Sequence, residues 1–281
     1  QVWYNTTSGT FKTVLNVGGW SAGGNLAVAV RGNRSAGTQN AALTAFGNTA
    51  APAFVNTSYE YNGSSWASNI AANTGRAYLS GFGIQTAAIY AGGYSGPVYN
   101  NTEEYNGSSW ANVNAIGTAR FYVGGAGTET AGLIYLGTPP DTGKTEEYNG
   151  TTWSEVNDNP TARRFGNGFG TQTAALAAGG LPNSAVSSQE YDGTNWTSGG
   201  NLNTGRGYTQ GCGTLTAGLV MGGNQGSPSS STAAELYDGT TFTTTTNMAT
   251  GQNDGGGNGT QTAGLYSGGG PTHSNVTQEF N

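Results

Sequence analysis

The chain has 281 residues, of which 50 are glycine, 9% are charged and 35% are apolar. Its 15 tyrosines and 6 tryptophans are too many for a disordered chain, and its net charge of -6 at pH 7 argues against nucleic acid as a partner. No apolar stretch approaches the roughly 18 residues of a membrane span, so no membrane insertion is expected, and the single cysteine excludes an internal disulfide framework.

Residues 1–19 precede the repeated part of the chain and predict a small β-hairpin. Val2–Asn5 and Thr10–Val14 each favour a strand, and the Thr-Thr-Ser-Gly run between them favours a turn. We therefore expect residues 1–19 to form an N-terminal lead-in and residues 20–281 to form the main domain.

Residues 20–281 contain six copies of one pattern, in which an aromatic residue is followed 17 positions later by the glycine of a Gly-Thr-Gln-Thr-like turn. The pairs are Trp20 and Gly37, Trp66 and Gly83, Trp110 and Gly127, Trp153 and Gly170, Trp196 and Gly213, and Phe242 and Gly259. The interval from this glycine to the next aromatic residue varies from 21 to 24 residues. A repeat of about 44 residues is typical of propellers and solenoids, and insertions confined to one segment map to loops on one face.

Each copy has the pattern of four antiparallel strands. In the copy that starts at Arg76, residues 77–83 alternate large and small side chains and residues 86–91 form a second apolar strand. Thr102–Tyr105 predicts the third strand, and residues 108–111 begin the fourth. Four antiparallel strands per repeat make one blade of a β-propeller.

An Asn-Gly or Asp-Gly pair separates the third strand from the fourth, as at Asn106-Gly107, and favours a two-residue type I′ turn. The sixth copy reaches Asn281 with only three strands, and Gly19–Ala22 has the sequence of the missing fourth. The sequence therefore predicts an all-β fold, a six-bladed β-propeller of four-stranded antiparallel blades. An N-terminal strand is expected to complete the C-terminal blade and so remove the free edge.

The repeat resembles the kelch motif. A glycine pair such as Gly92-Gly93 is followed by Tyr105 and then Trp110, and Arg76 precedes the first strand. The resemblance covers residues 20–281, although the spacing from tyrosine to tryptophan is shorter than in most kelch repeats. It implies a kelch-like propeller.

A second resemblance concerns function. The N-terminal segment, together with the phrases Glu-Tyr-Asn-Gly-Ser-Ser-Trp and Gly-Thr-Gln-Thr-Ala-Ala-Leu, resembles stretches of tail-fibre-like virion proteins of marine tailed phages. This implies a non-enzymatic, extracellular appendage on the virion surface, a receptor-binding or decoration protein for a host-surface glycan or protein. Its N-terminal segment would contact other virion proteins. A secreted bacterial kelch-type lectin or adhesin is the alternative.

The variable segment of each repeat lies between the second and third strands, on the face that also carries the connections between blades. We call this the loop face, and the opposite side, with its short repeated turns, the turn face. Variable loops on a rigid scaffold are where binding usually resides, although neutral drift would explain the variation equally well. The candidate ligand-binding residues on these loops are Tyr94, Tyr99, Asp141, Lys144, Asn183 and His273.

Four arginines precede the innermost strands on the loop face, while Val30 and Gln252 take the same place in two copies. They are Arg76, Arg120, Arg163 and Arg206. Such arginines could ring the channel mouth and bind a carboxylate or sulfate bidentately. Their repetition favours ion pairs within the scaffold instead, with the third-strand glutamates Glu60, Glu104, Glu147, Glu190, Glu235 and Glu279.

Catalysis is not expected. His273 and Cys212 are too few ligands for the copper sites of kelch-scaffold oxidases. A sialidase-like glycan hydrolase is the nearest enzymatic alternative, because sialidases combine six blades, axial arginines and an Asp-box in the same hairpin. Asp192-Gly193, however, lacks the residue that this box places between its Asp and Gly. We therefore expect no catalytic residues, no metal and no cofactor.

Overall fold

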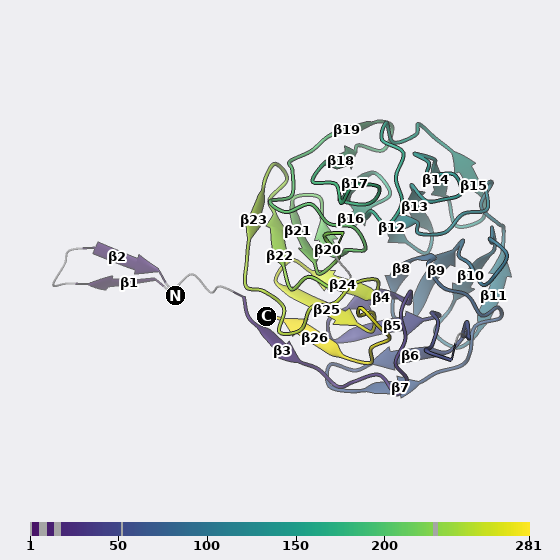
Figure 1. The fold of residues 1–281 in the computed structure, drawn as a ribbon, viewed down its shortest axis with the longest axis horizontal. Helices are drawn as coiled ribbons and strands as arrows, with labels where there is room; N and C mark the ends of the chain where they lie inside the picture. Colours follow the sequence, from purple (N-terminus) through teal and green to yellow (C-terminus); the bar gives the residue numbers. More distant parts are fainter. Residues whose placement is uncertain (1, 6–9, 14–17, 52, 227–229) are drawn as a thin grey trace.

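The protein is a six-bladed β-propeller, so the predicted fold class is confirmed. The computed structural model describes residues 2–5, 10–13, 18–51, 53–226 and 230–281, and these form six four-stranded antiparallel sheets arranged in a ring (Figure 1). The described residues contain no helix, and so no helix able to cross a membrane.

The first strand of each blade lies next to the axis and the fourth lies at the rim. Blade 1 is β4 (Arg34–Thr38), β5 (Ala41–Ala45), β6 (Ser58–Tyr61) and β7 (Trp66–Ser68). Blade 2 is β8 (Ser80–Ile84), β9 (Ala87–Ala91), β10 (Thr102–Tyr105) and β11 (Trp110–Val113). Blade 3 is β12 (Gly124–Thr128), β13 (Ala131–Tyr135), β14 (Thr145–Tyr148) and β15 (Trp153–Glu155). Blade 4 is β16 (Asn167–Thr171), β17 (Ala174–Ala178), β18 (Ser188–Tyr191) and β19 (Trp196–Ser198). Blade 5 is β20 (Gln210–Thr214), β21 (Ala217–Met221), β22 (Ala234–Tyr237) and β23 (Phe242–Thr244).

Blade 6 joins the two ends of the domain. Its strands are β24 (Gly256–Thr260), β25 (Ala263–Ser267), β26 (Thr277–Phe280) and, from the N-terminal side, β3 (Trp20–Ala22). Phe280 pairs with Trp20, and their rings lie 5.2 Å apart. The Trp20 indole also donates to the carbonyl of Thr246 in the preceding blade. The ring is therefore closed by pairing between residues about 260 positions apart, which leaves β26 without an open edge.

Two further strands precede the propeller. β1 (Val2–Asn5) and β2 (Thr10–Thr13) pair antiparallel, with Val2 opposite Thr13. The turn expected at residues 6–9 lies outside the described residues.

The repeated glutamine of the Gly-Thr-Gln-Thr turn fastens each blade that has it to the blade before it. The Gln85 amide donates to the carbonyls of Ala42 (3.1 Å) and Tyr61 (2.8 Å) in blade 1. Gln39, Gln172 and Gln261 make the corresponding pair of bonds to blades 6, 3 and 5. One side chain thus pairs two carbonyls that would otherwise lack a donor at the blade boundary.

The repeated tyrosine and tryptophan also bond to the preceding blade. The hydroxyl of Tyr105 donates to Glu60, and that of Tyr191 donates to Glu147. The indole of Trp196 donates to Thr145 Oγ1 at 3.0 Å, and Trp66 and Trp153 repeat this bond. In each of these blades the tyrosine and tryptophan rings lie about 5 Å apart at paired positions. The fixed spacing of the two aromatic residues therefore follows from strand pairing.

The turn between the third and fourth strands is a four-residue loop, so the predicted two-residue type I′ turn is wrong. In blade 2, Tyr105 pairs with Trp110, and Asn106–Ser109 lie in the loop. Asn106 Oδ1 accepts bonds from the amides of Ser108 and Ser109, and Gly107 alone in this loop has a positive φ, 88°. The asparagine therefore acts through its side chain, which explains why aspartate can replace it in blades 4 and 5.

The innermost strands are rich in glycine because they approach one another closely around the axis. A Cβ on Gly125 would lie 2.0 Å from Ser80 Oγ of the neighbouring blade, and one on Gly256 would lie 2.1 Å from Ser35 Oγ of the neighbouring blade. The apolar core lies further out, between blades. One such cluster packs Leu43 and Phe46 of blade 1 against Tyr90 and Trp110 of blade 2.

Candidate functional site

A ring of six backbone hydrogen bonds surrounds the axis on the loop face. Each N–H donates to the carbonyl of the equivalent residue in the preceding blade, over distances from 2.6 to 3.3 Å, and the last bond closes the circle. All six residues have a left-handed φ between 55° and 69°. They are Gly32, Tyr78, Tyr122, Phe165, Tyr208 and Asp254. We call this set the axial ring. Five of its residues are not glycine. Because the closed hydrogen-bond network holds them in the same left-handed conformation around the axis, their side chains come together.

The four aromatic side chains of the axial ring stack side by side. The ring centroids of Tyr78 and Tyr122 lie 4.7 Å apart, those of Tyr122 and Phe165 lie 3.4 Å apart, and those of Phe165 and Tyr208 lie 3.6 Å apart. The three tyrosines remain partly exposed. These phenols are neutral at pH 7 with the ordinary pKa of 10.0, and burial, and then the charge of Asp254, raises the pKa of each further.

The aromatic surface continues outward from the axial ring over two blades. Phe121 lies 4.6 Å from Tyr122, Tyr94 lies 5.1 Å from Phe121, and Phe54 lies 5.7 Å from Tyr94, measured between ring centroids. Phe54 and Tyr94 belong to the variable loops of blades 1 and 2, and all three side chains are partly exposed. A band of aromatic rings thus runs from the axis across the loop face.

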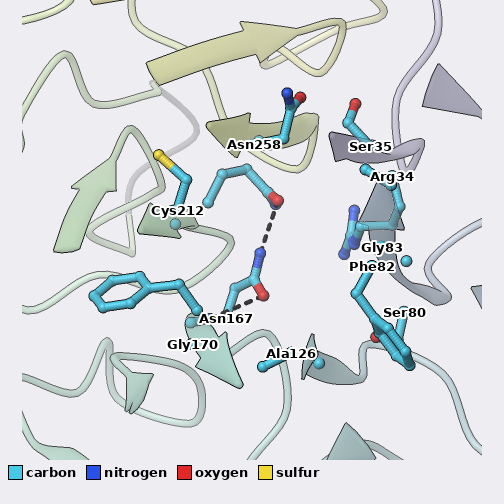
Figure 2. Close-up of a pocket in the computed structure, with 18 of the residues that line it drawn as sticks. Arg34, Ser35, Ser80, Phe82, Gly83, Ala126, Asn167, Gly170, Cys212 and Asn258 are labelled. Atoms are coloured by element: carbon cyan, nitrogen blue, oxygen red, sulfur yellow. Dashed lines mark hydrogen bonds between the residues drawn. The ribbon is translucent and has the colours of Figure 1, made fainter. Parts of the chain in front are cut away.

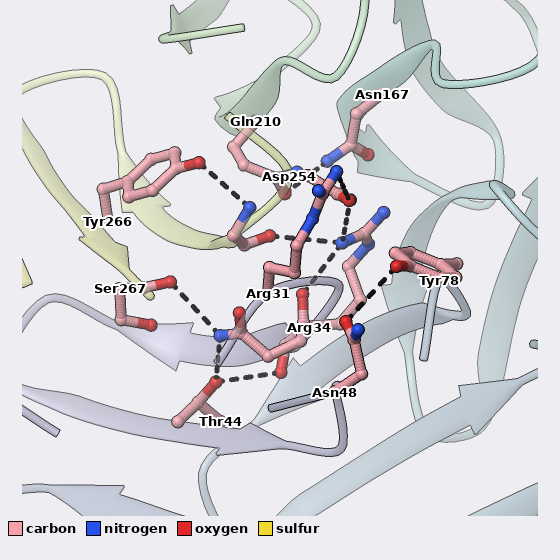
Figure 3. A network of polar contacts seen from close by, with 12 residues as sticks. Arg31, Arg34, Thr44, Asn48, Tyr78, Asn167, Gln210, Asp254, Tyr266 and Ser267 are labelled. Carbon is pink, nitrogen blue, oxygen red and sulfur yellow. Dashed lines mark hydrogen bonds and ion pairs between the residues drawn. The ribbon is translucent and has the colours of Figure 1, made fainter. Parts of the chain in front are cut away.

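Charged groups flank this band at two places. Asp254 is fully buried and lies 3.4 Å from Arg31 and 3.6 Å from Arg34 (Figure 3). One nitrogen of Arg164, Nη1, donates to both carboxylate oxygens of Asp141 at 2.7 and 2.8 Å, and the guanidinium lies 5.9 Å from the centre of the Phe165 ring. The side chains of Arg31, Arg164 and Asp141 are 28%, 36% and 22% exposed, so part of each lies at the surface.

The loop residues that the sequence predicts to bind a ligand lie in different surroundings. Tyr94 and Asp141 belong to the aromatic band and its charged border, as described above. Tyr99 bonds Ser95 through its hydroxyl, and Lys144 pairs with Glu155 on the rim strand β15. Asn183 is exposed, and His273 is partly buried, with its pKa lowered by burial and by the charge of Arg31.

The arginines do not ring the channel mouth, so that expectation is corrected. Arg76, Arg120, Arg163 and Arg206 are at most 2% exposed. Arg76 pairs with Glu103 and Arg120 with Glu146, one position before the glutamates expected at 104 and 147. Arg206 pairs with Glu235 at 2.5 Å, as expected. Within the described residues Arg163 has no carboxylate partner, and it donates to Gly179 and Ser187 instead.

The repeated glutamates have a different task from the one expected. Glu60, Glu147, Glu190 and Glu279 accept the tyrosine hydroxyl of the following blade. The residue that pairs with arginine points to the other side of the strand, because successive side chains alternate. In blades 2 and 3 the predicted glutamate is one position out of register, so its side chain lies on the other side of the third strand from the arginine.

The axial ring was not predicted, although the sequence contains a pattern that marks its aromatic residues. Each aromatic member stands two positions after the repeated arginine, in Arg76-Ala-Tyr78, Arg120-Phe-Tyr122, Arg163-Arg-Phe165 and Arg206-Gly-Tyr208.

Among the residues that the structure describes, no three histidine, cysteine or acidic side chains gather as a metal site would require.

No model of a known protein family matches this chain. No curated protein sequence matches it at a significant level either. The likeness to kelch repeats and to phage virion proteins therefore stays a prediction from the sequence.

Proposed function

We propose that the protein is a non-catalytic binding module, exposed on a tailed-phage virion, that recognises a host-surface glycan through the aromatic band of its loop face. The observation that carries the proposal is the continuous run of partly exposed rings from Phe54 through Tyr94 and Phe121 to Tyr122. Flat aromatic surfaces bind the apolar faces of sugar rings and supply contact area at low entropic cost.

The border of the band suits the polar edges of a sugar. Arg31 and Arg164 offer guanidinium donors, Asp141 offers a carboxylate, and the phenols of the axial ring both donate and accept. The one carboxylate of the axial ring, Asp254, is fully buried between two arginines. It is therefore poorly placed to act on a glycosidic bond, which favours binding over hydrolysis.

The test compares two band variants with a variant on the turn face. Phe54→Ala and Tyr94→Ala each remove a peripheral ring without touching the axial ring. Losing about 1.5–3 kcal/mol of aromatic contact should weaken glycan-array binding or host adsorption about tenfold or more. Ile84→Ala is the control, because this side chain is 55% exposed on the turn face.

A glycan that binds both band variants as tightly as the parent protein, or that is lost only in Ile84→Ala, would place the binding surface elsewhere. The location is tested separately, by mass spectrometry of purified particles of the phage whose genome encodes the chain. Finding the protein only in the culture medium of a bacterium would favour the secreted lectin.

A further inference from the structure

A cavity lies on the axis beneath the axial ring, on the side of the turn face. It is partly open, has a volume of about 110 Å³ and is lined by the innermost strand of every blade, from Arg34 and Gln210 near the axial ring to the glycines that precede the turns (Figure 2). This volume holds several water molecules or one small ion. The aromatic side chains described above lie at the opposite end, so the cavity is separate from the surface proposed to bind glycan.

Several buried polar groups of the lining lack a hydrogen-bond partner within the protein. They are Arg34 Nε, Ser80 Oγ, Gln210 Nε2 and Asn258 Oδ1, in residues that are 7%, 2%, 1% and 6% exposed. Asn167 donates to Gln210 Oε1 at 2.7 Å, which holds the Gln210 amide in place with its N–H groups unused. Leaving such groups unpaired costs about 1–3 kcal/mol each, so a polar occupant within their reach would stabilise the folded protein.

The charge of the lining selects the sign of that occupant. Arg34 is the one ionisable side chain with a charge at pH 7 among the described residues that line the cavity, since Cys212 is a buried, neutral thiol. The guanidiniums of Arg34 and Arg31 both face one carboxylate, that of Asp254, so the three groups together carry one net positive charge. Figure 2 shows the Arg34 guanidinium and the Asn167 amide pointing toward the middle of the cavity from different walls.

We propose that the axial cavity binds a small oxyanion, a free sulfate or phosphate ion or a small carboxylate, between Arg34 and Gln210. The guanidinium supplies the countercharge and the amide supplies a second donor. The volume of the cavity suits an ion of this size. The cavity lies apart from the aromatic band, and Arg34 shares its carboxylate partner, Asp254, with Arg31 at the border of that band.

The experiment measures thermal unfolding of the whole chain in sulfate, phosphate or acetate, each against chloride at matched ionic strength. We expect at least one of these anions to raise the Tm saturably, as a ligand of the folded state does. Gln210→Glu keeps the acceptor for Asn167 and replaces the free N–H donors with a negative charge. Its dissociation constant for the anion should rise about tenfold or more. Arg164→Gln, on the loop face, should bind the anion as the parent protein does.

A crystal grown or soaked in selenate tests the site without any substitution. Anomalous density beside Arg34 in the axial cavity is the expected result. No such density, no saturable Tm increase in any of the three anions, or equal anion binding in Gln210→Glu would each overturn the proposal. Loss of the effect in Arg164→Gln would move the anion to the loop face and equally overturn it.

Discussion

At the scale of single residues, the buried arginine and its partner vary together from blade to blade. Where the third strand supplies Glu103, Glu146 or Glu235, the arginine is present and paired. In blade 1 the two positions are Val30 and Tyr59, which pack against each other with Leu26. In blade 6 they are Gln252 and Gln278, and Gln278 exchanges two bonds with the backbone of Thr250. A charge is buried where its countercharge is also buried, as its desolvation cost requires.

Blade 4 is the exception and predicts the effect of two substitutions. Arg163 has Gln189 opposite, and burial lowers the pKa of its guanidinium to about 10. Gln189 Oε1 has no partner within the protein. Gln189→Glu should therefore raise the free energy of unfolding by roughly 1–3 kcal/mol at pH 7. Glu103→Gln, which strands Arg76, should lower it by about 3–5 kcal/mol.

The control for this pair is Gln278→Glu, which places the same new carboxylate opposite Gln252 instead of an arginine. It should destabilise the protein, because the charge has no partner there. Urea unfolding of the three variants distinguishes the cases. Equal effects of Gln189→Glu and Gln278→Glu would show that Arg163 does not respond to a carboxylate at position 189.

At the scale of elements, the glutamine in the turn between the first two strands joins neighbouring blades, and two blades lack it. Blade 5 has Leu215 in this place, and Leu215 packs against the cluster that contains Phe169 and Phe242. Blade 3 has Glu129, which cannot donate to the carbonyls that a glutamine would reach. Burial, and then the charge of Glu129, raises the pKa of Glu104 in the preceding blade.

Glu129→Gln should stabilise the protein at pH 7 by about 1–2 kcal/mol, because it adds two donors and removes a like charge. The raised pKa of Glu104 means that the folded state holds its proton more tightly. Stability of the parent protein should therefore fall as the pH rises above the ordinary value of 4.5 and through the raised value. The variant should lose the part of this dependence that comes from Glu129 and keep the part that comes from burial of Glu104.

Glu129→Ala provides the control, because it removes the charge without adding donors. Its stability at pH 7 should lie between those of the parent and Glu129→Gln, and its pH dependence should resemble that of Glu129→Gln. Denaturant titrations from pH 4 to pH 8 measure both. If Glu129→Ala matched Glu129→Gln at every pH, the inter-blade bonds would contribute nothing in blade 3.

At the scale of the whole molecule, contacts between blades and one strand pairing within blade 6 hold the ring closed. The axial ring links all six blades on the loop face, and the turn glutamines link four of the six boundaries on the turn face. The boundary inside blade 6 differs, because it is the pairing of β26 with β3 that connects the two ends of the domain.

Removing residues 1–24, and with them β3, should leave the edge of β26 open and expose the Phe280 ring. We expect a Tm lower by many degrees and concentration-dependent aggregation, since an exposed strand edge pairs with other chains. Removal of residues 1–17 alone keeps β3 and serves as the control. A truncated protein that stays monomeric with the Tm of this control would show that β3 is dispensable for closure.

The number of blades, the four strands of each and most of their ends can be predicted from the sequence. These features follow from local spacing: a fixed interval between aromatic and glycine residues repeats six times, and alternation along a strand needs no distant partner. The loop positions of Tyr94 and Asp141 could be predicted from the sequence for the same reason. The contacts of each side chain could not be predicted in this way. The glutamates expected to pair with the arginines are one residue out of register in two blades.

The side chains that meet on the axis are seen in the folded ring and not in the local sequence patterns. Tyr78, Tyr122, Phe165 and Tyr208 are 43 or 44 positions apart in sequence, and they touch because the closed ring brings the same position of every blade to one point. Arg34, Asn167 and Gln210 face one cavity for the same reason. Local patterns specify a blade, but the surfaces at the axis arise from six blades meeting, and their chemistry depends on which residues depart from the repeat there.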